Sequence, residues 1–347
     1  MRLVSTAHWR TPPPLADNSH RATTTSRARR HDHAMKDTMN EPTRPAESGE
    51  PPDDAPRRLT IEVVDKAPAP HVLYARVLAG LVKRRRAAQL PASRFVLPAA
   101  TLEPAAVERY ARVCGFAPGH GVPLTYPHLL AFPLHLMLLT EPGFPWPALG
   151  IVHLANRVRL WRPLAPGDTL RIEAECGPLL AHERGQAFTI SVRIYRRGET
   201  VWEGDSRYLK RNAAAHGLPL APLPLSIDRD ALARQARWPL PSRLGRDYAQ
   251  VSGDFNPIHL TMLTAKVFGF SRAIAHGMWT LAHAAAALQP RAPLAAAELD
   301  GEFKLPLFLP GEASLWSASR AACEREFEVR DAAGDKPHLR GRFNWDV

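Results

Sequence analysis

The sequence predicts an α+β protein built from two copies of one unit, in which a long apolar helix is followed by four strands. Two segments of helical length, 126–140 and 276–288, are almost wholly apolar, as expected for helices buried on most sides. After each of them come runs of strand length separated by turn residues such as Pro166-Gly167 and Arg197-Gly198. Helices and strands that follow one another in separate runs favour the α+β class.

Local repeats between the halves support a duplication. The segment 107–115 resembles 246–253, and 159–167 resembles 303–311. The sequence therefore predicts an N-terminal copy at 57–212, a Pro-rich linker at 213–236 and a C-terminal copy at 237–347. Residues 1–56 are poor in apolar side chains, so we expect a disordered tail, or a misassigned start with Met35 or Met39 as the first residue.

The elements are expected in the same order in both copies. In the N-terminal copy a strand and a helix come first, at 59–64 and 72–81, and a basic cluster, Lys83–Arg86, follows. A strand from residue 94, a helix at 102–114 and the apolar helix then precede strands at 149–160, 169–177, 186–196 and 199–210. The C-terminal copy has a strand at 237–240, a helix at 243–251, the second apolar helix, and strands at 298–303, 313–319, 324–330 and 338–345.

The C-terminal copy carries residues suited to proton transfer between its two helices. Asp254, Asn256 and His259 fall within six residues, around Pro257, in a loop that Gly and Pro keep from being helical. A short rigid loop can aim a carboxylate and an imidazole at one point. Downstream, Gly277 offers an amide at a helix start, where negative charge is favoured. Together these groups indicate an active site.

These residues carry a family resemblance. The segment Tyr248–Ala265, with Ser-Gly-Asp-Phe-Asn-Pro-Ile-His at its centre, and Ala275-His-Gly-Met278 resemble the MaoC-like (R)-specific enoyl-CoA hydratase (hydratase 2) family. The shared pattern is Gly-Asp-x-Asn-Pro-x-His, then Ala, then Gly-Phe (Gly269-Phe270), then Ala-His-Gly-Met. It covers only about residues 237–347, and Thr261 stands where the family often has an acidic residue. The resemblance implies a hot-dog fold in each copy, hence a double hot-dog.

The resemblance also implies the chemistry, which is reversible hydration of a trans-2-enoyl thioester to the (3R)-hydroxyacyl form. Asp254 and His259 are expected to hold one water; one group takes its proton as the oxygen attacks C3, and the other protonates C2. The sequence leaves the order of these roles open. Gly277 N–H is expected to stabilise the thioester oxygen, and Asn256 to orient the histidine or the loop. The expected substrate-binding residues are Gly253, Pro257, Phe268, His276, Met278 and Lys304.

Simpler structural interpretations stand beside several of these assignments. His276 suits packing or hydrogen bonding, and His276 with His283 lacks a third ligand at helical spacing, so no metal site is expected. Phe268 suits either an acyl channel or the core, and Lys304 either a phosphate contact or solvent. The cluster Lys83–Arg86 favours a solvated helix end, with a clamp for coenzyme A phosphates as the alternative.

The N-terminal copy lacks the catalytic pattern. At the loop position it has Phe116-Ala-Pro-Gly-His120, and at the helix start it has Thr125-Tyr-Pro-His128. No Asp, Asn or helix-starting Gly stands in the matching places. We therefore expect a degenerate partner that widens the acyl tunnel, and a single catalytic site per chain.

Composition limits the partners. The net charge of +11 suits coenzyme A or an acidic acyl carrier protein, whereas the absence of an aromatic-interleaved basic ribbon disfavours nucleic acid. Three separated cysteines without a CxxC motif predict reduced thiols in a cytoplasmic protein. No apolar run is long enough for a membrane span. No cofactor is expected, and monomer and homodimer both remain open.

The sequence thus predicts a cofactor-independent hydro-lyase acting on 2-enoyl thioesters. An enzyme alternative is the carrier-linked 3-hydroxyacyl dehydratase of fatty acid or polyketide synthesis, which runs the same chemistry backwards. A non-catalytic acyl-thioester-binding subunit is the alternative from another class, and the intact Asp254, Asn256 and His259 set argues against it. Hot-dog thioesterases usually lack this loop.

Overall fold

The computed structural model describes residues 59–82 and 89–347. The predicted tail and the basic cluster Lys83–Arg86 lie outside the described residues. In the N-terminal half the helices are α1 (Pro70–Ala79), the 3₁₀ helix η1 (Gly80–Val82), α2 (Pro104–Cys114) and α3 (Pro127–Thr140). The strands are β1 (Thr60–Val63), β2 (Ser93–Thr101), β3 (Ile151–Leu160), β4 (Thr169–His182), β5 (Gly185–Arg196), β6 (Glu199–Arg211) and β7 (Leu218–Pro219).

The C-terminal half repeats this order. Its helices are α4 (Leu244–Ser252), the 3₁₀ helix η2 (Pro257–His259), α5 (Met262–Val267) and α6 (Gly277–Leu288). Its strands are β8 (Ala233–Leu240), β9 (Ala296–Phe303), β10 (Gly311–Ala321), β11 (Glu324–Asp331) and β12 (Pro337–Asp346). The predicted helices and strands of both halves are confirmed with small shifts in their ends.

Three features differ from the predicted elements. β7 and the first residues of β8, which begins at Ala233, fall inside the segment predicted as linker. α5 was not predicted, because six residues are too few for a helical period to show in the sequence. Its start is fixed by Thr261, whose side chain accepts from Thr264 N while Thr264 bonds back to the Thr261 amide.

The strands of the described residues form one continuous sheet in the order β1-β2-β4-β5-β6-β3-β9-β12-β11-β10-β8, and β7 pairs with β4. The halves join where β3 pairs antiparallel with β9, from Ala155 opposite Glu302 to Leu160 opposite Ala297. Pairing is antiparallel along this path except for β1, which runs parallel to β2 at one edge. The arrangement is an α+β double hot-dog, with α3 as the long helix of one half and α6 as that of the other.

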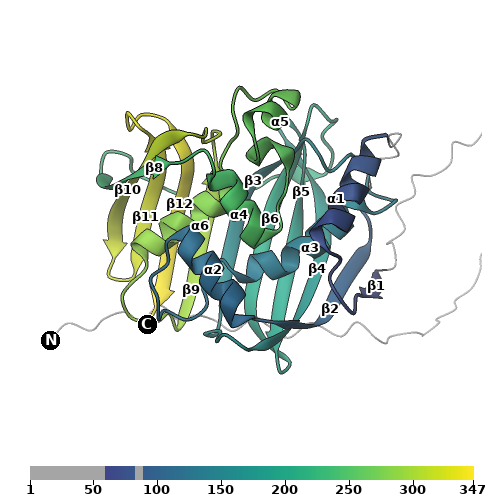
Figure 1. Cartoon of the computed structure of the whole chain (residues 1–347), viewed down its shortest axis with the longest axis horizontal. Helices are drawn as coiled ribbons and strands as arrows, with labels where there is room; N and C mark the ends of the chain where they lie inside the picture. The colour runs from purple at the N-terminus through teal and green to yellow at the C-terminus, as the bar shows by residue number, and fades with distance from the viewer. Residues whose placement is uncertain (1–58, 83–88) are drawn as a thin grey trace, which may run out of the picture. The chain divides into compact units, whose positions relative to one another are not determined.

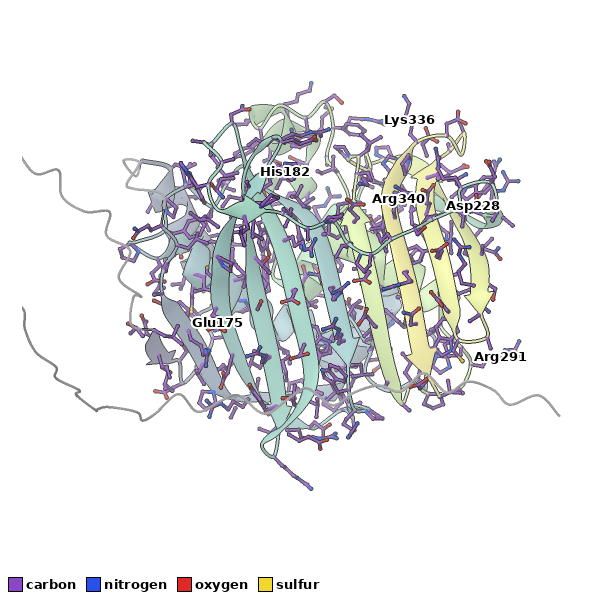
Figure 2. All side chains as sticks on the ribbon, turned by 180° about the vertical axis from the view of Figure 1, so that it is seen from behind. Glu175, His182, Asp228, Arg291, Lys336 and Arg340 are labelled. Atoms are coloured by element: carbon purple, nitrogen blue, oxygen red, sulfur yellow. The ribbon has the colours of Figure 1, made fainter. Side chains whose placement is uncertain are left out.

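The labelled helices lie on one face of the sheet (Figure 1). Apolar residues of α3 and α6, such as Leu134, Leu138, Leu281 and Ala282, are fully buried against it. Seen from behind, the strands lie in front of the helices, and charged side chains such as Glu175 and Arg340 project from the open face (Figure 2). The interior between helices and sheet is therefore the apolar core of the fold.

Ion pairs cross the seam between the halves. Arg157 Nε lies 2.6 Å from Asp300 Oδ1, and Arg159 Nε lies 2.6 Å from Glu298 Oε2. The carboxylate of Asp300 is fully buried beneath Arg157 and Arg342. No described helix is both long and apolar enough to cross a bilayer.

Candidate active site

The loop after α4 holds the predicted catalytic carboxylate in a set of tight turns. α4 ends at Gly253, whose φ of 74° is left-handed and is readily adopted by glycine. The amide of Asp254 donates to Ser252 Oγ at 3.1 Å, and the amide of Asn256 donates to Asp254 Oδ1 at 3.1 Å. Asn256 then caps η2 by accepting from Ile258 N at 3.4 Å. Asn256 thus orients the loop.

His259 ends η2 and is held through its Nδ1 atom. Nδ1 lies 2.9 Å from the carbonyl oxygen of Ile274, so this nitrogen carries the proton and donates it. Nε2 is thereby left as the basic nitrogen of the ring. α4 packs closely on this residue, because a β-carbon on Gly245 would overlap the carbonyl oxygen of His259. Gly245 is therefore required for the observed position of His259.

His276 links the loop to the start of α6. Its Nε2 lies 3.0 Å from the backbone oxygen of Asp254 and 3.8 Å from Oδ2 of the same residue. Its ring stacks on His259 with 3.7 Å between centroids, and Tyr248 packs against it at 4.8 Å. The Nδ1 atom of His276 is buried without a hydrogen-bond partner in the structure. These contacts are of the packing and hydrogen-bonding kind, and substrate binding by His276 stays a prediction.

A residue that sequence reasoning missed completes the surroundings of Asp254. Tyr74, on α1, donates its hydroxyl proton to Asp254 Oδ1 at 2.7 Å. The Tyr74 ring also meets the Phe255 ring edge-on at 6.3 Å. α1 is anchored on α3 by Leu73 and Val77, which are almost fully buried. The two partners lie 180 positions apart in the chain, so no local pattern could have shown their contact.

The surroundings of Asp254 and His259 lower the pKa of both groups, so that both can accept a proton at neutral pH. Burial raises the pKa of Asp254, but the His276 and His259 imidazoles, the Tyr74 hydroxyl and the Asn256 amide together hold it below its usual value. Burial lowers the pKa of His259, and the Asp254 carboxylate and the Ile274 carbonyl only partly offset this. Burial also lowers the pKa of His276, to about 3. At neutral pH the site holds a carboxylate beside neutral imidazoles.

Comparison with known proteins places this site in a family. A family model for the MaoC like domain matches residues 229–302. The 3-hydroxyacyl-thioester dehydratase X of Mycobacterium tuberculosis is 32% identical over 255 residues, which are 73% of this chain and 90% of that protein. The chain belongs to the MaoC-like dehydratase family.

Solved structures agree with this membership. The crystal structure of HtdX from Mycobacterium tuberculosis aligns with a TM-score of 0.63 and 30% identity, covering 73% of this chain and all of that chain. A MaoC-like dehydratase from Phytophthora capsici aligns with the same TM-score of 0.63 at 18% identity, covering 75% of this chain and 96% of the other. The second likeness supports the fold alone.

In this MaoC-like chain Gly277 is the first residue of α6. The first amides of a helix have no partner inside the helix and carry its positive end. Met278 is buried in the core behind it. A β-carbon on Gly277 would lie 2.9 Å from the Phe303 ring, so only glycine fits here without displacing that ring. Pro257 opens η2 beside the same loop.

Two predicted substrate-binding residues, Phe268 and Lys304, make contacts within the protein, and substrate binding by them stays a prediction. Phe268 packs with α1 and α3 residues in a small apolar cluster around Leu73 and Val77. Lys304 Nζ lies 2.7 Å from Glu302 Oε1. His283, considered as a metal partner of His276, bonds through Nδ1 to the carbonyl of Cys114 at 2.8 Å and stacks on Trp279. These contacts support the core interpretation of His283.

Asp254, His259 and His276 present ligand atoms within 4.8 Å of one another, a spacing that a metal ion would also accept. Asp254 already accepts from Tyr74 and from the Asn256 amide. His259 Nδ1 and His276 Nε2 are both engaged with backbone oxygens. These hydrogen bonds fix the orientation of the carboxylate and of both imidazole rings.

In the N-terminal half, the loop after α2 corresponds to the loop after α4 but carries different side chains. A cleft of about 230 Å³ lies there, lined by Phe116, His120, Pro163 and Leu294 among others. His120 Nδ1 lies 2.6 Å from Gln289 Nε2, and His120 has no carboxylate partner like Asp254 among the described residues. The degenerate first copy stays a prediction.

Proposed function

We propose that this protein interconverts 2-enoyl thioesters and (3R)-3-hydroxyacyl thioesters, with Asp254 and His259 acting on a single water. Its membership of the MaoC-like dehydratases makes it a hydro-lyase of acyl thioesters. The observation that carries the residue assignment is the closeness of a half-buried carboxylate and a buried imidazole, whose ligand atoms lie within 4.8 Å of each other, with the pKa of each group below its ordinary value. The (3R) configuration of the product is proposed from the resemblance of the Asp254–His259 loop to the (R)-specific hydratases.

The proton route follows from the charge states. Because Asp254 is ionised and His259 is neutral, neither brings a proton of its own to the reaction. In hydration the water oxygen forms the bond to C3 while one of the pair accepts a water proton. The proton that this group now carries is delivered to C2, so the water supplies the hydroxyl on C3 and the hydrogen on C2. This route replaces the transfer through two separate groups that the family resemblance implies. Dehydration is the reverse, and the two groups titrate as a coupled pair.

Negative charge on the thioester oxygen must be stabilised while C2 is protonated. The Gly277 amide at the start of α6 suits this role, because it adds the positive end of the helix to a hydrogen-bond donor. A fixed donor of this kind contributes about 3–4 kcal/mol to lowering the barrier in comparable enzymes.

Tyr74 acts as a positioning residue in this proposal. Its hydroxyl occupies Oδ1 of Asp254 and leaves Oδ2 on the side of His276. Because the Tyr74 hydroxyl and the Asn256 amide both bond to Oδ1, the carboxylate cannot rotate without losing two hydrogen bonds. One fixed oxygen then faces the water.

The carrier of the acyl group is coenzyme A or an acyl carrier protein. The net charge of +11 favours an anionic carrier but suits both. A relative named 3-hydroxyacyl-thioester dehydratase favours dehydration of carrier-bound 3-hydroxyacyl groups as the physiological direction. Monomer and homodimer are both compatible with one site per chain.

The deciding experiment follows the loss of enoyl absorbance with crotonyl-CoA and a longer trans-2-enoyl-CoA. We expect rapid loss with the wild type, formation of the (3R) alcohol, and kcat lowered at least about 100-fold in Asp254→Asn and in His259→Ala. An acyl-carrier thioester in the same assay separates the two carriers. Formation of the (3S) alcohol, or full activity of both variants, would contradict the assignment.

Matched controls come from the same chain. Asp247→Asn changes an exposed α4 carboxylate that pairs only with Arg243, 3.3 Å away, among the contacts described. His182→Ala changes the last residue of β4, labelled in Figure 2, whose Nδ1 accepts from the Arg184 amide. Both should hydrate crotonyl-CoA at the wild-type rate.

A further inference from the structure

The interior of the N-terminal half contains a buried group of polar side chains that the proposed mechanism does not use. We call it the polar cluster; its members are His128 and His135 on α3, His153 and Asn156 on β3, and Ser206 and Tyr208 on β6. All are buried except His153, which is half-buried. In the C-terminal half, by contrast, the interior strand positions include Leu299, Phe327 and Phe343, all fully buried.

A bulge in β3 explains why so many polar groups meet. His153 is paired with Tyr208, and Asn156 with Ser206, because the register shifts between His153 and Ala155. Without the extra residue, positions 153 and 156 would point to opposite faces of the sheet. With it, all four side chains point to the helix side. His128 and His135, seven residues apart, share one face of α3.

The members touch one another directly. The His153 and Tyr208 rings stack with 4.8 Å between centroids, and the His128 and His135 rings meet at 5.2 Å. His135 Nδ1 lies 3.0 Å from Tyr208 Oη. Asn156 Nδ2 donates to Ser206 Oγ at 2.8 Å and approaches His153 Nε2 at 3.5 Å.

The cluster adjoins the candidate active site. His153 packs on Phe303 at 4.9 Å between centroids, and the same Phe303 ring lies against Gly277. The Asp254 carboxylate is near enough to raise the pKa of both His128 and His153, although burial dominates and lowers these to about 4 and about 3. An acyl chain that extends from Gly277 into the N-terminal half would therefore pass these side chains.

Two atoms of the cluster have unmet hydrogen-bonding capacity. His135 Nε2 and Asn156 Oδ1 are buried without a partner, and both residues are fully buried. Leaving such atoms unpaired costs about 1–3 kcal/mol each, so natural interiors rarely keep them unless a ligand or water bonds to them. Asn156 Oδ1 can only accept, and thus calls for a donor.

We propose that the polar cluster is a subsite for a hydroxyl group on the acyl chain of the substrate. A hydroxyl both donates and accepts, so it can donate to Asn156 Oδ1 and can pair with an imidazole nitrogen whether that nitrogen carries a proton or not. A ketone only accepts, and an anionic carboxylate would face imidazoles that are neutral at pH 7. The proposal rests on the proposed thioester hydratase function and adds a substrate class to it: hydroxylated 2-enoyl thioesters.

The experiment compares trans-2-octenoyl-CoA with its analogues that carry a hydroxyl at each carbon from C5 to C8. For the wild type we expect one analogue to have kcat/KM about tenfold above that of the plain substrate, because a hydrogen-bonding pocket penalises a chain that leaves it unpaired. Equal or lower kcat/KM for every hydroxylated analogue would overturn the subsite. Crotonyl-CoA hydration, measured alongside, reports on the proposed function separately.

A double variant tests which residues are responsible. His135→Phe with Tyr208→Phe removes both ends of one hydrogen bond, so no single partner is left unpaired. In this double variant the ratio of kcat/KM for the hydroxylated analogue to kcat/KM for trans-2-octenoyl-CoA should fall to near one. The matched control is Tyr110→Phe with Thr125→Val, which removes another buried pair, 2.8 Å apart, outside the cluster; it should retain the preference. Loss of preference in the control as well would overturn the proposal.

Discussion

At the scale of single residues, Asp254 is defined by what surrounds its two oxygens. Oδ1 accepts from Tyr74 at 2.7 Å and from the Asn256 amide at 3.1 Å, while Oδ2 faces His276. The carboxyl side chain nevertheless remains 26% exposed. A carboxylate that is both fixed and reachable suits a group that must exchange protons with a bound water.

Tyr74→Phe tests the positioning role. Losing a hydrogen bond to the ionised form should raise the pKa of Asp254 and loosen the carboxylate. We expect kcat to fall about tenfold, with KM little changed and the acid limb of the pH profile moved to higher pH. Steady-state hydration of crotonyl-CoA from pH 4 to pH 8 measures this.

The pH profile of the wild-type rate is the reference against which the Tyr74→Phe profile is compared. Because the pKa values of both Asp254 and His259 lie below their ordinary values, the rate should be flat near neutral pH and fall only below pH 6.5. A purely structural Tyr74 would lower activity through loss of folded protein and leave the shape of the profile unchanged. Thermal melting of the variant separates these outcomes.

Residues of the site that lie close together along the chain could be predicted from the sequence, and those that lie far apart could not. Asp254, Asn256 and His259 form one short loop, so their type and spacing were enough to suggest a site. The sequence offers no such signal for Tyr74, and it marks His276 only through the Ala275-His-Gly-Met278 motif. Tyr74 reaches the site only because Leu73 and Val77 anchor α1 on α3, a packing contact that no motif encodes.

At the scale of elements, the site depends on how closely α4 approaches η2. Gly245 on α4 lies directly against the backbone of His259, and a β-carbon there would overlap the carbonyl oxygen. Gly245→Ala must therefore push η2 away or displace α4. We expect a loss of about 1–3 kcal/mol in the free energy of unfolding and a clear fall in kcat. Urea unfolding and the crotonyl-CoA assay measure these two effects.

Gly80→Ala is the matched control for this substitution. Gly80 follows α1 with right-handed φ of −68°, and a β-carbon there would meet nothing within 4 Å. Alanine should be tolerated, with stability and activity near those of the wild type. If Gly245→Ala behaved like Gly80→Ala, the close packing of α4 on His259 would not be what holds the histidine.

The helices and strands could be predicted from the sequence more readily than the contacts between them. The two apolar helices and the strands of both halves followed from periodicity and turn residues, because burial dictates both. α5 and the early start of β8 did not follow. α5 depends on a local capping box, and β8 on pairing with the distant β10.

At the scale of the whole molecule, the unusual feature is the number of neutral histidines inside. Burial lowers the pKa of His128 to about 4 and those of His153 and His276 to about 3. These imidazoles lie on α3, on β3 and at the start of α6, so they belong to both halves of the molecule. Their effect on stability is therefore a property of the whole fold.

The sign of that effect is fixed by linkage. An unfolded histidine titrates near pH 6.5, so below this pH the unfolded chain binds protons that the folded chain excludes. The stability from these neutral imidazoles is fully present above pH 6.5 and is lost as the pH falls toward their folded pKa values. At pH 5 the loss is up to about 2 kcal/mol for each histidine.

Urea unfolding at pH 7 and pH 5 tests this prediction. We expect the wild type to lose several kcal/mol between the two values, about 4–6 for three histidines. His128→Phe removes one of these sites, so its loss should be smaller than that of the wild type by about 2 kcal/mol, whatever its stability at pH 7. Equal losses in the two proteins would mean that His128 is hydrated enough to titrate normally, and that the interior of the N-terminal half admits water freely.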